Sequence, residues 1–312
     1  MILTKLNKSD FEKILDWYSI GRYRSHKHIP YALSNTIYLL RTSKGKFILK
    51  VFECNIKHVR YQIRIIESLK KLVPVAQDIE TRDKKIIFPY KKKYLVIQKF
   101  AEGKHPKTFS MTLIKDCADK FALMNKRLSK LRFRSKDYWG PYHQFKKKKT
   151  VEKFRDFKLQ KNFDEIVEKI RTLDRKKIRR SIIHADLTVS NILVKGNKLT
   201  AILDFDDAHT DFLVHDIATF MGKVLVGKNK VLEKKMKVFL KTFQNRIKLN
   251  SEEKKACYYF MMYRILKSVR YAVGSLKKNP DRKKFINRWF DKRSKVFNIL
   301  KKYPIEKFLK LF

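Results

Sequence analysis

Residues 182–216 read IIHADLTVSNILVKGNKLTAILDFDDAHTDFLVHD, and this stretch decides which architecture we expect. It holds six aspartates and two lysines, whereas the whole chain has 76 Lys and Arg, 30 Asp and Glu, and a formal net charge of +46. Apolar runs at Asn191–Val194 and Leu199–Phe205 flank the turn Gly196-Asn197, which predicts a strand–turn–strand unit. An acidic segment in so basic a chain indicates that these carboxylates have a chemical role.

Three polar residues occupy informative positions around this hairpin. Asp186 lies in a polar loop, Asn191 follows five residues later, and Asp204 ends the second apolar run. A hairpin would bring Asp204 back beside Asn191. Phosphoryl transfer requires a carboxylate near the acceptor hydroxyl and oxygen ligands for Mg²⁺. The spacing therefore predicts a phosphoryl-transfer site, with Asp186 as the catalytic base and Asn191 and Asp204 as Mg²⁺ ligands.

The pattern His184-x-Asp186-x4-Asn191, followed by Asp204, resembles the motifs of the aminoglycoside phosphotransferase/choline kinase superfamily of small-molecule kinases. Ala185 stands where that superfamily usually has glycine. Asp206 replaces the glycine of a protein-kinase DFG motif, and Asp216-Ile217-Ala218 resembles the superfamily's Asp-Leu-Ala helix start. The last two features favour a small-molecule kinase over a protein kinase.

The N-terminal sequence extends the resemblance. Residues 35–49, NTIYLLRTSKGKFIL, are similar to the N-S-N-Y-L-L-R-T-x-x-G-x-Y-I-L pattern of homoserine kinases in this superfamily. Residues 65–69 and 100–103 are similar to their L-M-E-H-L and F-L-x-G segments. The resemblance covers most of residues 25–103 and 181–221. It implies an α+β, two-lobed protein-kinase-like fold, with a small antiparallel-sheet N-lobe over residues 1–100 that binds ATP and a mostly helical C-lobe over 101–312.

The resemblance also implies the roles of individual residues. Lys50 would hold the α- and β-phosphates of ATP, and the loop Ala32–Thr36 would cover the phosphates through its backbone and hydroxyl groups. Backbone near Gln98–Phe100 would meet adenine. Glu67 is a candidate ion-pair partner of Lys50, although Gln62 aligns better with the glutamate of aminoglycoside kinases. The cofactor-binding residues are thus Ser34, Asn35, Thr36, Lys50, Glu67, Gln98 and Phe100.

The acceptor stays open at this stage. The resemblance implies ATP-dependent phosphorylation of a small hydroxylated metabolite, with homoserine as the first candidate and choline, ethanolamine, an aminosugar or an aminoglycoside as alternatives. Asp207 and Asp211 could contact a cationic acceptor, but a solvated or loop-capping role is equally compatible with their positions. A RIO-type protein kinase near ribosomes and a non-catalytic polyanion-binding protein are further alternatives. Intact Lys50, Asp186, Asn191 and Asp204 argue against the last.

Composition places the protein among folded chains and leaves the meaning of its charge open. Hydrophobic residues make up 44% of the 312 residues, and the three cysteines lack CxxC spacing, which disfavours a disulfide framework. The N-terminus has no signal-peptide core and no apolar run could span a bilayer, so we expect a cytoplasmic protein. The basic residues are spread along the chain, as AT-rich coding would produce. They also allow weak polyanion binding, and nothing indicates the oligomeric state.

Hydrophobic periodicity predicts the remaining elements. We expect helices at 1–20 and 59–72, strands at 37–40, 47–52, 85–88 and 94–100, and a helix at 111–131. The charged region 133–180 reads as an insertion or as surface helices, and 216–312 is helix-patterned. We expect His184 to orient the catalytic loop by hydrogen bonding, and Asp216 to cap a helix or hold that loop.

Overall fold

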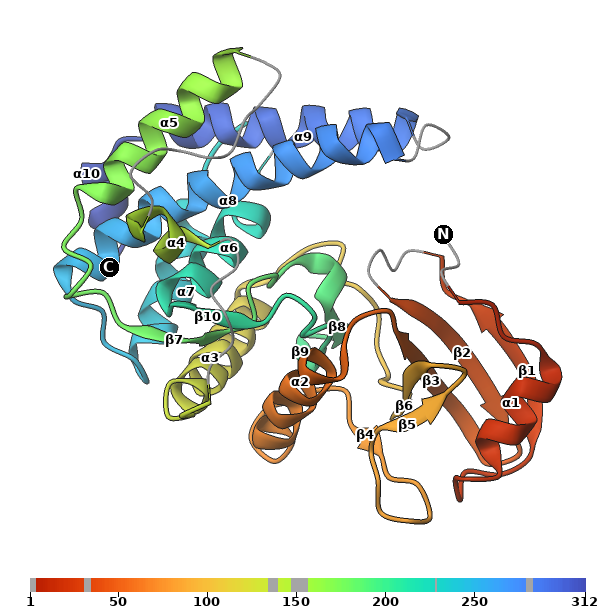
Figure 1. The fold of residues 1–312 in the computed structure, drawn as a ribbon. Coiled ribbons are helices and arrows are strands. Elements are labelled where there is room, and N and C mark those ends of the chain that lie inside the picture. Colours follow the sequence, from red (N-terminus) through yellow and green to blue (C-terminus); the bar gives the residue numbers. More distant parts are fainter. Residues whose placement is uncertain (1–3, 31–34, 134–139, 147–156, 228, 279–282) are drawn as a thin grey trace. The chain divides into compact units, whose positions relative to one another are not determined.

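The computed structural model describes residues 4–30, 35–133, 140–146, 157–227, 229–278 and 283–312 (Figure 1). The chain divides into two compact units. We call the first, residues 1–104 with 193–195 and 200–206, the sheet unit. The second, residues 105–192, 196–199 and 207–312, is the helical unit. Each is described by itself.

The sheet unit is built on an antiparallel sheet. Within the described residues its strands run in the order β1-β2-β3-β6-β4, and β5 pairs with β6. The turn at Thr42–Gly45 joins β2 to β3 in register, as the sequence predicts for this hairpin. The strands are β1 (Tyr23–His28), β2 (Thr36–Thr42), β3 (Gly45–Phe52), β4 (Asp78–Ile79), β5 (Phe88–Tyr90) and β6 (Lys93–Lys99).

Helices α1 (Lys8–Leu15) and α2 (Ile56–Leu69) pack on opposite faces of this sheet. Alternation along β3 separates the two cores: Leu49 and Val51 pack with α1, whereas Phe52 packs with α2. Asn7 begins α1 with a capping box, and Asn55 caps α2. Lys50 therefore shares the α2 face of β3, which is the face that matters for the site.

The helical unit contains most of the helices. They are α3 (Met111–Leu128), α4 (Pro141–Lys146), α5 (Phe157–Arg171), α6 (Val214–Val224), α7 (Glu233–Gln244), α8 (Ser251–Lys278), α9 (Lys283–Lys302) and α10 (Ile305–Leu309). The long helices α8 and α9 lie side by side (Figure 1, blue). Phe220 of α6 stands between Phe121 of α3 and Phe239 of α7, with ring centroids 5.1 Å and 5.0 Å apart. These aromatic contacts fix α6, which borders the catalytic loop.

Short strands frame that loop. β7 (Arg180–Ile183) pairs antiparallel with β10 (His209–Phe212). Between them come a single 3-10 turn at Val189–Asn191 and the hairpin of β8 (Ile192–Lys195) and β9 (Lys198–Ile202). The predicted strand–turn–strand unit is therefore present, and residues 184–191 lie between β7 and β8.

The predicted α+β class is confirmed, and several element predictions need correction. Strand β1 was not predicted, because its residues, YRSHKH, are polar, as is common for a strand at the edge of a sheet. Strand β10 was not predicted either, and it lies within the acidic stretch. The strand expected at 85–88 is observed at Phe88–Tyr90, and the helix expected at 1–20 spans Lys8–Leu15. Among the described residues, none of the helices has the length and apolarity needed to cross a membrane.

Candidate functional site

Lys50 is the central cation of the sheet unit. Its side chain on β3 is 8% exposed, and Nζ forms ion pairs with Asp206 and, at 3.5 Å, with Asp204. Burial alone would lower the pKa of Lys50, but the charges of Asp206 and Asp204 raise it above its usual range. Lys50 is therefore held as a cation against two carboxylates. The candidate partner Glu67 instead pairs with Lys70 one turn away on the same side of α2.

Asp206 has a role that the sequence analysis did not assign. Its carboxylate accepts from Lys50 and from the side-chain amide of Asn35, and its backbone carbonyl lies 3.0 Å from Nε2 of His58. The missed signal was a second carboxylate two residues after the candidate metal ligand Asp204. Asp206 thus links β3, the start of β2 and α2.

The backbone at Asp204 is strained. Its φ is 61°, in the left-handed region that side chains with a Cβ rarely adopt. The preceding strand is tied to the sheet unit because Ile202 N donates to the carbonyl of Pro74 at 2.7 Å. The Asp204 side chain is 46% exposed. Strain of this kind persists where surrounding structure imposes it, often at functional sites.

The residues expected to cover the phosphates of ATP differ in how far they are buried and in their hydrogen-bond partners. Ser34 lies outside the described residues. Asn35 is 4% exposed and bridges Asp206 and the backbone N–H of Glu53. Thr36 is fully buried, and its hydroxyl donates to Glu53 (3.1 Å) while accepting from the N–H of Thr4. The Thr36 hydroxyl is thus engaged inside the sheet unit, and the expected contact of this hydroxyl with phosphate does not fit its surroundings.

Gln98 and Phe100 lie at the end of β6. Gln98 Nε2 donates to Oδ1 of Asp78 at 2.7 Å, across the β4–β6 pair. Phe100 is 40% exposed, with Lys46 Nζ 5.7 Å from its ring centroid. Oδ2 of Asp78 is buried and has no hydrogen-bond partner among the residues that the structure describes. Burial raises the pKa of Asp78 to about 6, against the opposing effect of the Gln98 hydrogen bond.

In the helical unit, Asp186 and Asn191 lie together as the motif predicts for a catalytic loop. Asn191 Nδ2 donates to both the backbone carbonyl and Oδ2 of Asp186, each at 2.9 Å. The 3-10 turn that ends at Asn191 folds the amide back onto the loop. This contact uses the nitrogen of the Asn191 amide and leaves its oxygen to act as a ligand.

Two cations that the sequence analysis did not single out contact the other oxygen of Asp186. Lys223 Nζ of α6 lies 3.0 Å and Arg264 Nη2 of α8 lies 2.8 Å from Oδ1. Burial alone would raise the pKa of Asp186, but the charges of Lys223 and Arg264 lower it below its usual range. Burial and the Arg264 charge lower the pKa of Lys223 to about 7. No local motif marks these two residues, because α6 and α8 meet Asp186 only through the tertiary fold.

Asp216 anchors the catalytic loop. It is fully buried in the first turn of α6, and its carboxylate accepts from the backbone N–H groups of His184 (3.0 Å) and Ala185 (2.7 Å) and from Asn125 Nδ2 of α3 (2.8 Å). His184 Nδ1 in turn accepts from the N–H of Asp186 at 3.3 Å. The structure therefore gives Asp216 and His184 the loop-holding roles expected from the sequence.

The backbone conformation of Ala185 explains why glycine is usual at this position in the family that the motif resembles. The φ of Ala185 is 68°, and its side chain is fully buried. Glycine adopts this left-handed conformation without a Cβ penalty, whereas alanine is strained there. The hydrogen bond from Ala185 N to Asp216 helps to hold the strained peptide in place.

The two candidate acceptor residues differ in environment. Asp207 is exposed. Asp211 is 1% exposed, accepts from the N–H groups of Tyr142 and Phe212, and lies 3.4 Å from His209 Nε2. A Cβ at Gly140 would come within 1.4 Å of its Oδ2. Because its oxygens are enclosed and engaged, Asp211 stabilises the β10 region, and the interpretation of Asp211 as an acceptor contact is not supported.

His209, Asp211 and His215 form a buried cluster whose ligand-type atoms lie within 4.8 Å of one another. Two backbone N–H groups already use the Asp211 carboxylate. Burial lowers the pKa of His215 well below its usual value, so this imidazole is neutral. We interpret His209 and Asp211 as a hydrogen-bonded part of the core, with His215 buried beside them.

Asn191 and Asp204 supply one amide oxygen and one carboxylate oxygen, which is the donor type that Mg²⁺ prefers. Such an ion usually keeps waters and phosphate oxygens as its other ligands, so one or two protein donors are sufficient. The donor chemistry of these residues therefore fits Mg²⁺.

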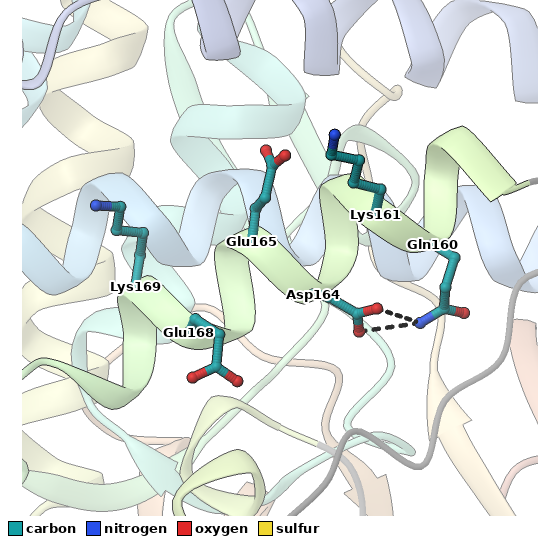
Figure 2. Close-up of a pocket in the computed structure, with 6 residues that line it drawn as sticks. All are labelled: Gln160, Lys161, Asp164, Glu165, Glu168 and Lys169. Atoms are coloured by element: carbon teal, nitrogen blue, oxygen red, sulfur yellow. Dashed lines mark hydrogen bonds between the residues drawn. The ribbon is translucent and has the colours of Figure 1, made fainter.

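A pocket elsewhere on the helical unit carries a different chemistry. It follows α5 and is lined by Gln160, Lys161, Asp164, Glu165, Glu168 and Lys169, with Gln160 hydrogen-bonded to Asp164 (Figure 2). These side chains come from one helix and carry both signs of charge. None of the predicted site residues lines this pocket, so it has no part in the site built around Asp186.

Comparisons with known proteins identify the family of this chain. The model of the phosphotransferase enzyme family matches residues 27–229. The chain is 26% identical over 230 residues to a homoserine kinase of Rhodopseudomonas palustris (strain BisA53), covering 70% of this chain and 68% of that protein. It also resembles the solved structure of amicoumacin kinase hAmiN in complex with AMP-PNP and Ca²⁺, with TM-score 0.73 and 17% identity, covering 96% and 95% of the two chains.

A second solved structure, the microcompartment-associated aminopropanol kinase, matches with TM-score 0.71 and 15% identity over 98% of this chain and 100% of that chain. The predicted kinase-like fold is thus confirmed by two structures that cover nearly the whole chain. The chain belongs to the phosphotransferase enzyme family, and it is a small-molecule kinase.

Proposed function

We propose that this kinase transfers the γ-phosphate of ATP to the hydroxyl of a small metabolite, with L-homoserine as the leading acceptor. The observation that carries the proposal is the Asp186–Asn191 pair in the loop between β7 and β8. Homoserine is preferred as acceptor because the curated relatives with homoserine kinase names match about 70% of the chain, at 26% identity.

Asp186 is proposed as the catalytic base. Since its pKa is depressed, its carboxylate is ionised at neutral pH and can accept the proton of the acceptor hydroxyl. Asn191 orients this carboxylate through one hydrogen bond to Oδ2 and holds the residue through a second to its backbone carbonyl. Phosphoryl transfer depends mostly on positioning and on neutralising charge, so a rigid base beside fixed cations suits the reaction.

Lys50 is proposed to hold the phosphates of ATP from the sheet unit. In the structure its ammonium is paired with Asp204 and Asp206, and it shares a sheet face with Gln98. Asn35 and Phe100 are proposed to border the nucleotide, and Asn191 and Asp204 to hold Mg²⁺. The metal, when bound, would neutralise charge on the transferred phosphoryl group.

Turnover by purified protein tests this function. Mg-ATP is supplied with L-homoserine, choline, ethanolamine, an aminosugar and an aminoglycoside in separate reactions, and ADP release is measured. We expect acceptor-dependent ADP release with L-homoserine. Asp186→Asn should lower kcat by about 10²–10⁴-fold, because it removes a general base while keeping the side-chain shape.

The nucleotide provides the internal control. The Asp186→Asn variant should bind a non-hydrolysable ATP analogue as tightly as the original protein, which shows that the loss lies in the chemical step. ATP binding without turnover on any hydroxylated acceptor would refute the proposed activity. Turnover on choline but not on L-homoserine would keep the kinase and replace the acceptor.

A further inference from the structure

The catalytic loop of the helical unit faces a surplus of positive charge. Lys223 of α6 and Arg264 of α8 have side chains that are 6% and 10% exposed, and both contact Oδ1 of Asp186. Arg293 of α9 is the third cation, and its charge acts on Lys223. Asp186 is the carboxylate whose charge acts on both Lys223 and Arg293. Two basic side chains therefore contact one carboxylate, and the charge of a third, Arg293, acts on the same cluster.

Arg293 is the least satisfied member of this cluster. Its Nε and Nη1 atoms are buried and, in the described structure, have no hydrogen-bond partner. Burial and the Arg264 charge lower the pKa of Arg293 to about 10, while Asp186 opposes this effect. Buried guanidinium nitrogens without partners are costly, so these two atoms of Arg293 need an explanation, and a bound ligand would provide one.

We propose that Lys223, Arg264 and Arg293 bind a negatively charged group of the acceptor, a carboxylate or a phosphate. The inference rests on the proposed kinase function, because it places the acceptor hydroxyl beside Asp186. A small acceptor whose hydroxyl reaches Asp186 also lies next to Lys223 and Arg264, which contact the same carboxylate. An anionic group on that acceptor would supply the partner that Arg293 lacks.

The same charges disfavour a cationic acceptor. A quaternary or polyamino compound would bring its charge toward three cations and one carboxylate, which is unfavourable in a partly desolvated site. Asp211, the carboxylate considered for a cationic acceptor, is enclosed by Tyr142, Phe212 and His209. The arrangement therefore selects acidic hydroxy compounds, of which L-homoserine, through its carboxylate, is one.

Binding of matched probes to the full-length protein, saturated with a non-hydrolysable ATP analogue and Mg²⁺, tests this proposal. L-homoserine and 3-amino-1-propanol differ only by the carboxylate, glycerol 3-phosphate carries a phosphate, and choline carries a permanent positive charge. Dissociation constants are measured by calorimetry for the original protein and for Arg293→Gln. Arg288→Gln is the matched control, since Arg288 is exposed on the same helix.

We expect L-homoserine or glycerol 3-phosphate to bind at least about tenfold more tightly than 3-amino-1-propanol or choline, as a charge-assisted hydrogen bond would give. The stronger of the two anionic probes identifies carboxylate or phosphate as the recognised group. Arg293→Gln should lose at least about tenfold in that affinity, and Arg288→Gln should lose none. The affinity of Arg293→Gln for the ATP analogue should be unchanged.

Several results would overturn the proposal. These are binding of 3-amino-1-propanol or choline as tight as that of the anionic probes, no binding of either anionic probe, and equal behaviour of the two arginine variants. Weaker binding of the ATP analogue to Arg293→Gln would assign the cluster to nucleotide phosphates. The probe comparison in the original protein decides the question even if Arg293→Gln does not fold.

Measurements of ADP release distinguish a failure of the anion site from a failure of the proposed kinase function. An anionic probe that binds through Arg293 but yields no ADP with Mg-ATP would refute the kinase proposal for that compound and keep the anion site. Phosphorylation of choline with no anionic compound accepted would keep the kinase function and refute the anion site.

Discussion

At the scale of single residues, the residues that share one loop could be predicted from the sequence, whereas contacts between distant segments could not. The spacing of Asp186 and Asn191 was enough to predict that both belong to one catalytic loop, and the structure adds the hydrogen bond between them. The ion pairs of Lys50 with Asp206 and of Asp186 with Arg264 could not be predicted in the same way. Those partners are 156 and 78 residues apart, and only the tertiary fold brings them together.

The buried carboxyl of Asp78 predicts a pH-dependent stability. Its pKa is raised from 3.8 to about 6 in the folded protein, so the native state binds more protons than the unfolded state between these values. The unfolding free energy therefore falls as pH rises through this window and stays lower above it. Asp78→Asn should be more stable than the original protein at pH 8, by at most about 3 kcal/mol.

Urea unfolding at pH 8 and at pH 4 measures this effect. The difference between the two proteins should shrink at pH 4, because the carboxyl of the folded state is then largely protonated and that of the unfolded state is only partly ionised. Asp78→Asn keeps the oxygen that accepts from Gln98, so the loss of that hydrogen bond does not enter the comparison. An advantage that is equal at both pH values would contradict the argument.

The left-handed backbone of Ala185 predicts a small effect for one substitution and a large loss of stability for another. Ala185→Gly removes the strain but also a buried methyl group, so the unfolding free energy should change by less than about 1 kcal/mol. Ala185→Val places a β-branched side chain in the same conformation and in a filled space, and should cost roughly 2–4 kcal/mol. Chemical denaturation measures both variants, and a Val variant as stable as the Gly variant would show that the strain is absent.

At the scale of helices and strands, amphipathic elements were predictable and polar ones were not. The α2 helix and the β2–β3 hairpin have apolar residues at regular spacing, since one face of each is buried. The edge strand β1 buries little and has the polar sequence YRSHKH, so its pairing with β2 leaves no periodic signal. The loop between β7 and β8 was predictable because its motif consists of polar residues at a fixed spacing. That signal does not depend on hydrophobic periodicity.

The attachment of α6 to the catalytic loop predicts a large effect for Asp216→Ala. The change leaves the N–H groups of His184 and Ala185 and the amide of Asn125 without their buried acceptor. The unfolding free energy should fall by roughly 2–4 kcal/mol. Asp291→Ala on the exposed side of α9 is the control and should change it by less than about 0.5 kcal/mol.

Urea denaturation compares the two variants, and kcat provides a second measurement. Since Asp216 positions the peptide before Asp186, kcat of Asp216→Ala should fall at a temperature where the variant is still folded. A stable Asp216→Ala protein with unchanged kcat would show that the loop does not depend on this anchor.

For the whole molecule, the formal charge of +46 predicts binding to polyanions outside the nucleotide site. The dissociation constant for a single-stranded RNA should rise at least about tenfold between 50 and 200 mM salt, because counterions are released when the complex forms. Fluorescence anisotropy measures this dependence. Excess ATP analogue is the control: displacement of the RNA would place it at Lys50, and no binding at 50 mM salt would dismiss polyanion binding.

The strained peptide at Ala185 also has a consequence for how this sequence can change over evolutionary time. We expect glycine to be replaceable at that position only while a buried carboxylate binds the N–H groups of residues 184 and 185, as Asp216 does here. We therefore expect the position of Asp216 to tolerate fewer substitutions than that of Ala185. Distant kinases of this kind should be easier to recognise by an aspartate at the start of the helix after the acidic stretch than by the residue between the loop histidine and the proposed catalytic aspartate.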